Sequence, residues 1–209
     1  MSLILPLERA ADLTDEAVRR CRAGLERQGH EVQILAVIGP YEDVPGTLVQ
    51  GLDRWVQSDR QGLVPAAIAG LNQADGDVLL VLDLTEGYLP DDLAKIVEPI
   101  AKERAELVVA QRASTTGSAL SRLGPRRIAR GWLGRLALRV LGSSDPFSGL
   151  VALHPSLLPE IAGNYRPVGS RFAVDLLLRS RARKAEVTVR TEAPRSRLAL
   201  EIDDLRHLK

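Results

Sequence analysis

Residues 66–83 read AAIAGLNQADGDVLLVLD, and this stretch decides the fold class. The small residues of its first half allow a helix to pack closely on a sheet, and Gly76 turns the chain into an apolar run. This run, Val78 to Leu82, lacks polar alternation, as in a parallel strand covered on both faces. It ends on Asp83, at the strand end where ligands bind in parallel α/β sheets. Two interpretations of Asp83 are equally supported: it holds a divalent cation with a diphosphate, or it caps the next loop.

Strand and helix patterns alternate on both sides of this unit. Further strands are expected at 3–5, 32–38, 106–110 and 187–191, and helices at 14–28, 65–72, 90–104, 125–141, 171–182 and 200–208. Cys21 lies on an apolar helix face, which favours a core residue over a nucleophile. No linker or internal repeat divides the chain. The sequence therefore predicts one α/β domain with a mainly parallel, mixed sheet flanked by helices.

The composition excludes several classes of protein. The chain has 209 residues, of which 45% are hydrophobic and 26% charged, so a disordered or fibrous protein is excluded. Its 28 basic and 27 acidic residues give a net charge of +1, and aromatic residues make up only 3%. Neither value is typical of a nucleic-acid-binding protein. One cysteine and three histidines also argue against a disulfide framework and a zinc site.

The N-terminus and the length of the apolar runs indicate in which compartment of the cell the protein is expected. Residues 1–7 lack the basic segment of a signal peptide, and their apolar run is short. The longest other apolar run, Val78 to Leu82, is far below the ~20 residues of a membrane span. We therefore expect a cytoplasmic protein that meets membranes, if at all, as a peripheral protein at their surface.

Six segments, in order, resemble the family 2 glycosyltransferases, especially the dolichyl- and polyprenyl-phosphate sugar synthases. Residues 60–83 are similar to their pattern of a basic residue and Gly, a small-residue helix, a buried strand and an Asp-x-Asp motif. The other matching segments are VVAQR at 108–112, DPFSGL at 145–150, FAVDL at 172–176, EVTV at 186–189 and SRL at 196–198. No single segment is decisive, and their order over most of the chain carries the resemblance.

The resemblance implies a GT-A fold in one domain, with a nucleotide-sugar half at 1–112 and an acceptor half at 113–209. It implies sugar transfer from a nucleotide sugar to a lipid phosphate, assisted by Mg²⁺ or Mn²⁺. Asp83, Asp145 and Ser148 would then be catalytic, and the metal would be held by Asp83, Thr85 and Glu86. The phosphate-binding residues that it implies are Arg112, Arg126, Arg127, Arg130, Arg195 and Arg197.

The nucleotide-binding motifs depart from the family pattern. The first strand is followed by PLER at 6–9 instead of Pro-x-x-Asn-Glu, and the second strand lacks its terminal pair of aspartates. The nearest carboxylates, Glu42 and Asp43, either substitute from the loop or lie on the solvated surface, and the surface interpretation is favoured. In place of Asp-x-Asp this chain has DLT at 83–85. Thr85 therefore stands where the family has its second aspartate, and a hydroxyl is a weaker ligand for a metal ion than a carboxylate. A charged hydrogen bond contributes about 1.5–3 kcal/mol. The loss of two anionic positions therefore predicts that nucleotide binding is weakened about a hundredfold or more.

A basic segment interrupts this otherwise balanced chain. Residues 107–144 contain seven arginines and no Asp, Glu or Lys, so the segment carries +7 and the remainder −6. Three interpretations stay open: an amphipathic helix with a solvated arginine face, docking on anionic lipid headgroups, or a site for the phosphate of a lipid carrier. A nucleic-acid groove is the least supported.

Three functions follow from these patterns. The first is a glycosyltransferase that moves a sugar from a nucleoside-diphosphate sugar to a polyprenyl-phosphate-like or other acceptor. The alternative is a catalytically eroded relative that acts as a binding or regulatory subunit. A nucleotidyltransferase is weaker still, because no Gly-rich phosphate loop with a Lys occurs near the N-terminus.

Overall fold

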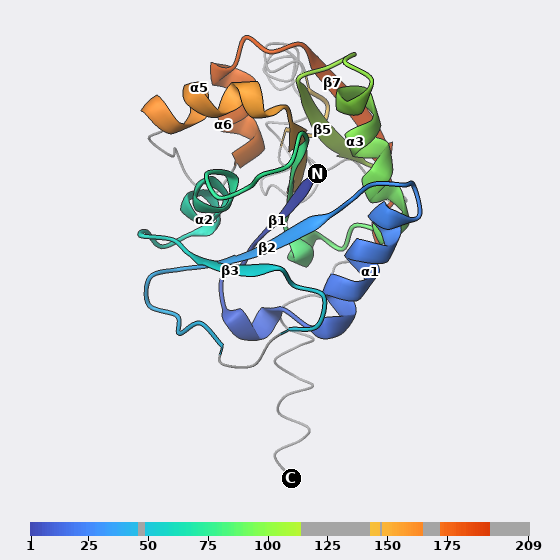
Figure 1. Cartoon of the computed structure of the whole chain (residues 1–209). Coiled ribbons are helices and arrows are strands. Elements are labelled where there is room, and N and C mark those ends of the chain that lie inside the picture. The colour runs from blue at the N-terminus through green and yellow to red at the C-terminus, as the bar shows by residue number, and fades with distance from the viewer. Residues whose placement is uncertain (46–48, 114–142, 147, 165–171, 193–209) are drawn as a thin grey trace, which may run out of the picture.

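Seven strands form a single mixed sheet in the order β3-β2-β1-β4-β6-β5-β7 (Figure 1). They are β1 (Ser2–Pro6), β2 (Gln33–Ile38), β3 (Arg54–Gln57), β4 (Leu79–Leu82), β5 (Leu107–Arg112), β6 (Leu150–Leu153) and β7 (Lys184–Val189). Strand β6 runs antiparallel to its neighbours β4 and β5, and the other neighbouring pairs are parallel. The structure is a computed structural model and describes residues 1–45, 49–113, 143–146, 148–164 and 172–192. The prediction of a mainly parallel, mixed sheet is confirmed.

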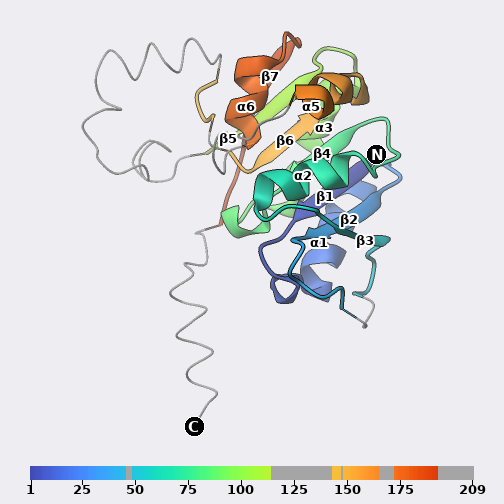
Figure 2. The same cartoon turned by 90° about the vertical axis from the view of Figure 1, so that its left-hand side faces the viewer.

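Helices cover both faces of this sheet. The α-helices of the described residues are α1 (Asp15–Glu26), α2 (Leu63–Leu71), α3 (Leu93–Ala101), α5 (Leu158–Asn164) and α6 (Phe172–Arg179). Helices α1 and α3 lie on one face, whereas α2, α5 and α6 lie on the other (Figures 1 and 2). The result is the three-layer arrangement that alternating strands and helices predict.

Alternate residues of the central strands supply two separate cores. In β1, Leu3 and Leu5 belong to the core beneath α1 and α3, and Ile4 belongs to the core beneath α2, α5 and α6. All three side chains are fully buried. Successive side chains of a strand point to opposite faces, so a strand that is covered on both faces is apolar at every position. This explains the unbroken apolar runs of β1, β2 and β4.

Helix α2 lies unusually close to the sheet, as its small residues predict. A Cβ atom on Gly70 would lie 2.4 Å from Cγ2 of Ile4 and 2.8 Å from Cγ2 of Val37, both in the sheet beneath it. Ala66 and Ala67 on the same helix are almost fully buried. The absence of larger side chains therefore sets the distance between α2 and strands β1 and β2.

Most of the expected elements are confirmed. Thr14 caps α1 by accepting a hydrogen bond from Ala17 N at 3.2 Å. Cys21 is buried, and burial raises the pKa of its thiol to about 12, so it is a core residue. The helix expected at 90–104 begins as a 3₁₀ turn and ends as α3 at Ala101.

Other elements differ from the prediction, or were expected at residues that the structure does not describe. Strands β3 and β6, of four residues each, and helix α5, of seven, were not predicted from the sequence. Strand β7 begins and ends earlier than expected. The helices expected at 125–141 and 200–208 lie outside the described residues.

The close approach of α2 gives a test of the fold. Replacing Gly70 by Ala should destabilise the protein by about 1–3 kcal/mol, because the added methyl overlaps the side chains of Ile4 and Val37. Urea denaturation followed by circular dichroism measures this loss. Asn72→Ala, at an exposed position just past the same helix, should change the unfolding free energy far less. Equal losses in the two variants would contradict the packing account.

Candidate active site

The described residues of the predicted site lie at one edge of the sheet. Strands β1 and β4 pair Ile4 with Val81, and β1 and β2 pair Pro6 with Val37, so Asp83 is level with the ends of the parallel strands β1 and β2. From β1 the chain continues to β2 and β3 on one side, whereas β4 lies on the other side of β1. Ligands of open α/β sheets bind at such a switch point, beyond the carboxyl ends of the strands. The topology therefore places Asp83 where a ligand is expected.

Asp83 begins the post-β4 turn, which we define as residues 83–89. Its Oδ1 accepts hydrogen bonds from Thr85 N at 2.9 Å and from Thr85 Oγ1 at 2.6 Å, and so caps the 3₁₀ helix η2 (Leu84–Glu86). The capping interpretation of Asp83 is confirmed by these contacts. Both bonds use the same carboxylate oxygen, and Asp83 is only half-buried.

Gly149 allows the post-β4 turn to lie against the pre-β6 segment, which we define as residues 143–146 and 148–149. Asp83 N donates to Gly149 O at 2.8 Å. A Cβ atom on Gly149 would lie 2.7 Å from Cβ of Asp83 and 3.0 Å from Cγ of Glu86. No side chain fits between them, so this position requires glycine for close approach.

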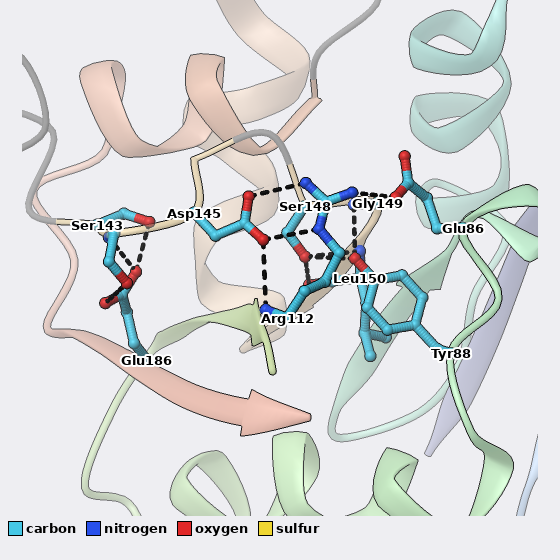
Figure 3. A network of polar contacts seen from close by, with 10 residues as sticks. Glu86, Tyr88, Arg112, Ser143, Asp145, Ser148, Gly149, Leu150 and Glu186 are labelled. Atoms are coloured by element: carbon cyan, nitrogen blue, oxygen red, sulfur yellow. Dashed lines mark hydrogen bonds and ion pairs between the residues drawn. The ribbon is translucent and has the colours of Figure 1, made fainter. Parts of the chain in front are cut away.

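Arg112, the last residue of β5, joins the two segments (Figure 3). Its Nε and Nη2 donate to the Asp145 carboxylate at 2.7 Å and 2.8 Å, and its Nη1 pairs with Glu86 on the post-β4 turn. Figure 3 shows the guanidinium between the two carboxylates. The side chains of Arg112 and Asp145 are only 10% and 3% exposed. Since breaking a buried pair leaves a charge without compensation, this pair fixes the relative position of both segments.

Two groups of this network, Arg112 and Tyr88, have pKa values raised by their surroundings. The hydrogen bonds to Asp145 raise the pKa of the Arg112 guanidinium further above its ordinary value. Burial raises the pKa of the Tyr88 phenol well above its ordinary value, so the phenol stays neutral. Tyr88 Oη lies 2.8 Å from Ser148 Oγ and accepts from Gly149 N at 3.1 Å. The buried tyrosine thus provides a second link between the two segments.

Glu186 of β7 anchors the start of the pre-β6 segment. Its carboxylate accepts from Ser143 Oγ at 2.5 Å, from Ser144 N at 2.6 Å and from Ser144 Oγ at 2.9 Å (Figure 3). Asp145 follows these serines directly. Glu186 therefore holds the backbone from which Asp145 reaches Arg112.

The chain after β7 runs beside the post-β4 turn. Leu89 N donates to Arg190 O at 3.2 Å, and Glu192 N donates to Gly87 O at 2.8 Å. Gly87 has a φ of 70°, a left-handed conformation that suits glycine. The described chain therefore ends next to the turn that carries Asp83.

Asp92 fixes this last stretch. Its buried carboxylate accepts from Arg190 N at 2.8 Å and from the Arg190 guanidinium at 2.8 Å and 3.0 Å, and it pairs with Lys95. These bonds, chiefly those from Arg190, hold the pKa of the Asp92 carboxyl well below its usual range. Asp92 is thus a structural carboxylate that holds the end of β7 against the turn.

Asp83, Thr85 and Glu86 are the three expected metal ligands, and two of them offer oxygen atoms suited to a divalent cation. The described residues contain no group of three or more His, Cys, Asp or Glu side chains that would hold a metal ion unaided. Asp83 and Thr85 offer a carboxylate and a hydroxyl on one turn, whereas Glu86 points to Arg112. Mg²⁺ is commonly bound through one or two carboxylates together with substrate phosphates. The chemistry of Asp83 and Thr85 therefore fits a cation that arrives with a diphosphate.

Comparisons with known proteins agree with this fold and topology. The family model described as glycosyl transferase family 2 matches residues 54–147, which include β4, Asp83, Arg112 and Asp145. A dolichol-phosphate mannosyltransferase from Pyrococcus furiosus is 27% identical over 132 residues, covering 61% of this chain and 37% of that protein. The middle of the chain is therefore similar to glycosyltransferase family 2.

Solved structures show the same fold over nearly the whole chain. Glucosyl-3-phosphoglycerate synthase from Mycobacterium tuberculosis, in complex with phosphoglyceric acid, matches with a TM-score of 0.62 at 19% identity, covering 98% of this chain and 74% of that one. Mannosyl-3-phosphoglycerate synthase from Rubrobacter xylanophilus matches with a TM-score of 0.61 at 17% identity, covering 100% and 73%. The M. tuberculosis enzyme has also been crystallised with Mn²⁺ and uridine-diphosphate-glucose. The GT-A fold expected for a family 2 glycosyltransferase is therefore confirmed.

The structure brings together part of the predicted site. Asp83, Thr85, Glu86, Arg112, Asp145 and Ser148 lie around one junction between the post-β4 turn and the pre-β6 segment. The geometry gives Arg112 two carboxylate partners, which differs from the expected role as a phosphate ligand. The other expected phosphate-binding residues, which lie outside the described residues, are Arg126, Arg127, Arg130, Arg195 and Arg197.

Several residues of this junction were missed as site residues. Tyr88, Gly149 and Glu186 all contribute to the junction. Gly149 and Glu186 lie in segments that resemble the family, and this resemblance is the sequence feature that could have identified them as site residues. Tyr88 carried none, because its role depends on Ser148, sixty positions away in the chain.

The Arg112–Asp145 pair can be tested by single substitutions. Asp145→Asn should destabilise the protein by about 3 kcal/mol or more, because it leaves the buried guanidinium without its main counter-charge. Glu86→Gln is the matched control: Glu86 is 26% exposed and the pair with Asp145 remains, so a loss of about 1 kcal/mol or less is expected. Chemical denaturation measures both. A larger loss in Glu86→Gln than in Asp145→Asn would show that the anchor of Arg112 is wrongly assigned.

Proposed function

We propose that this chain transfers a sugar from a nucleoside-diphosphate sugar to an acceptor that carries a phosphate group. The observation that carries the proposal is the contact between Asp83, at the switch point of the sheet, and the pre-β6 segment, held together by Gly149 and Arg112. The match to the family model over residues 54–147 supports the reaction class. The chain spans 37% of the length of its curated relative, so the whole protein's activity is part of this proposal.

The reaction requires little of the chain's own acid–base groups. The bond between the anomeric carbon and the donor phosphate oxygen breaks, and its electron pair leaves with the nucleoside diphosphate. With a polyprenyl phosphate as the acceptor, a bond from its phosphate oxygen to the anomeric carbon forms in its place. A phosphate monoester is largely ionised at pH 7, since its second pKa is about 6, so no strong general base is needed.

Within this proposal Asp83 and Thr85 hold a divalent cation, Mg²⁺ or Mn²⁺, together with the donor diphosphate. Such a cation offsets the charge that develops on the departing diphosphate. Ser148 and Asp145 shape the acceptor side, and Asp145 acts there by fixing Arg112. Residues 1–112 then form the donor half and 113–209 the acceptor half, with phosphate contacts from the arginines at 126–130 and 195–197.

Two phosphate-bearing acceptors are supported by relatives. The P. furiosus relative is named for a dolichol phosphate, and the M. tuberculosis enzyme was crystallised with phosphoglyceric acid. No helix in the described part of the chain has both the length and the apolar character needed to cross a membrane. A lipid-phosphate acceptor would be met at the membrane surface, where the seven arginines of 107–144 supply positive charge.

Donor binding is tested by thermal denaturation with a panel of nucleoside-diphosphate sugars, with and without Mn²⁺. A ligand at ~100 times its dissociation constant adds about 2.7 kcal/mol, which raises Tm by roughly 5–10 °C for a chain of this size. Asp83→Asn should abolish the Mn²⁺-dependent part of this shift. It keeps an oxygen that caps the turn, so its Tm without ligand should change little.

Three outcomes separate the hypotheses. No shift with any nucleotide sugar at millimolar concentration would overturn the proposed function. A shift that is the same in Asp83→Asn would overturn the metal-binding role of this residue. Binding without turnover of any acceptor would support the eroded relative instead.

The acceptor is identified by mass spectrometry of the product after incubation with the donor that binds. A polyprenyl phosphate in anionic vesicles and 3-phosphoglycerate in solution serve as the two arms, and the corresponding unphosphorylated alcohols are the controls. We expect product from a phosphate-bearing acceptor and none from its alcohol. Glycosylation of an alcohol at the same rate would contradict a phosphate acceptor. Vesicle flotation that weakens with added salt would support docking by the basic segment.

A further inference from the structure

Asp92 occupies the N-cap position of α3, but its side chain makes no cap hydrogen bond with that helix. An aspartate at this position ordinarily accepts from the free N–H groups of the first turn. Here the carboxylate binds Arg190 instead, through the guanidinium and the backbone N, and it pairs with Lys95 at 2.8 Å. The side chain of Asp92 is only 1% exposed. A buried carboxylate is therefore used for a contact ninety-eight positions away in the chain, at the expense of a local cap.

The backbone that carries Asp92 is itself held in place. Asp92 ends the 3₁₀ helix η3 (Pro90–Asp92), and its N donates to Leu89 O at 3.0 Å. Helix α1 packs directly on η3, since a Cβ atom on Gly24 would lie 2.7 Å from the carbonyl carbon of Pro90. No side chain separates the two backbones at this point. The carboxylate of Asp92 is thus presented from a fixed position.

Arg190 begins the post-β7 segment, which we define as residues 190–192. This segment lies antiparallel to the end of the post-β4 turn: a bridge joins Thr191 to Tyr88, and a backbone hydrogen bond lies on either side of it. Asp92 accepts from both the backbone and the side chain of Arg190, so it fixes the segment at its first residue. The pairing of the segment with the turn therefore depends on Asp92.

Tyr88 connects this backbone pairing to the candidate site. Its backbone faces the post-β7 segment, whereas its phenol contacts Ser148 and Gly149 (Figure 3). Asp83 stands at the other end of the same turn, where Gly149 and Arg112 hold it. The turn is thus held at its start by the pre-β6 segment and at its end by the post-β7 segment.

We propose that Asp92 is a positioning residue for donor binding: through Arg190 it holds the post-β7 segment against the post-β4 turn, and so orients Asp83 toward the cation and diphosphate. This inference rests on the proposed function and assigns a residue that acts through the turn and not by contact with the donor. Groups that orient a ligating side chain typically change the affinity or activity of a metal site about 10–100-fold. A carboxylate that served only to stabilise α3 would bond to the first turn of that helix.

Hydrogen exchange followed by mass spectrometry tests the positioning without any ligand. Asp92→Asn should raise the exchange rate of peptides that cover residues 83–89 about tenfold, because the turn loses the support of the post-β7 segment. Lys95→Gln is the matched control: it removes the 53% exposed partner of Asp92 and leaves the pair with Arg190, so its exchange should match the wild type. Unchanged exchange over residues 83–89 in Asp92→Asn would overturn the proposal.

Isothermal titration calorimetry measures the consequence for the donor, as the dissociation constants of UDP and GDP with Mn²⁺. The titrations are made at a temperature where circular dichroism shows every variant to be folded. Asp92→Asn and Arg190→Gln should each weaken binding about tenfold. The double variant should bind no more weakly than either, because both substitutions remove the same pair. Lys95→Gln should bind like the wild type.

Gly70→Ala separates positioning from stability. This substitution is expected to destabilise the protein through the packing of α2, so it should leave the affinity of the folded protein unchanged. Equal weakening of UDP and GDP in Gly70→Ala and Asp92→Asn would overturn the positioning role. Additive losses in the double variant would also overturn it, because Arg190 would then act independently of Asp92.

The remaining outcomes distinguish this inference from the proposed function. If the wild type binds UDP or GDP and Asp92→Asn binds it equally well, the assignment of Asp92 is wrong and the proposed function stands. If the wild type binds neither nucleotide, the proposed function has failed, and with it the role of Asp92 in donor binding. The exchange experiment would then still decide whether Asp92 orders the post-β4 turn.

Discussion

The buried guanidinium of Arg112 is the constraint on which the geometry of the site depends. It is the one cation held by both the post-β4 turn and the pre-β6 segment among the described residues, through Glu86 and Asp145. A buried charge costs several kcal/mol unless it is paired and hydrogen-bonded. Any movement of one segment against the other would break such a pair. The position of Asp83 relative to Ser148 is therefore set by electrostatics as much as by the sheet.

The same network determines what the site can bind. Asp83, Glu86 and Asp145 carry three negative charges and Arg112 carries one positive charge, so the formal charge of these four side chains is −2. A diphosphate would be repelled by this group unless positive charge enters with it. One divalent cation balances the charge of this group, so Asp83, the carboxylate of the post-β4 turn that does not pair with Arg112, is compatible with cation-assisted binding of a nucleotide.

The sequence was sufficient for features that depend on neighbouring residues. The apolar run that ends on Asp83, the cap at Thr14 and the small residues of α2 all encode local geometry, and the structure has them as expected. Strand β6 was missed because its four residues follow a polar segment, and its pairing with β4 and β5 is long-range. The partners of Arg112 were missed for the same reason: Asp145 is thirty-three positions away, and no periodicity reports such a contact.

Thr85 shows how a change within a motif can be accommodated by the local structure of a turn. Where the family has the second carboxylate of Asp-x-Asp, this chain has a hydroxyl that donates to the first carboxylate at 2.6 Å. A second aspartate could not donate that bond at neutral pH, and two carboxylates at this distance would repel each other without a cation. Thr85 thus stabilises the turn without a cation. Gly149 and Arg112 keep the pre-β6 segment against this turn.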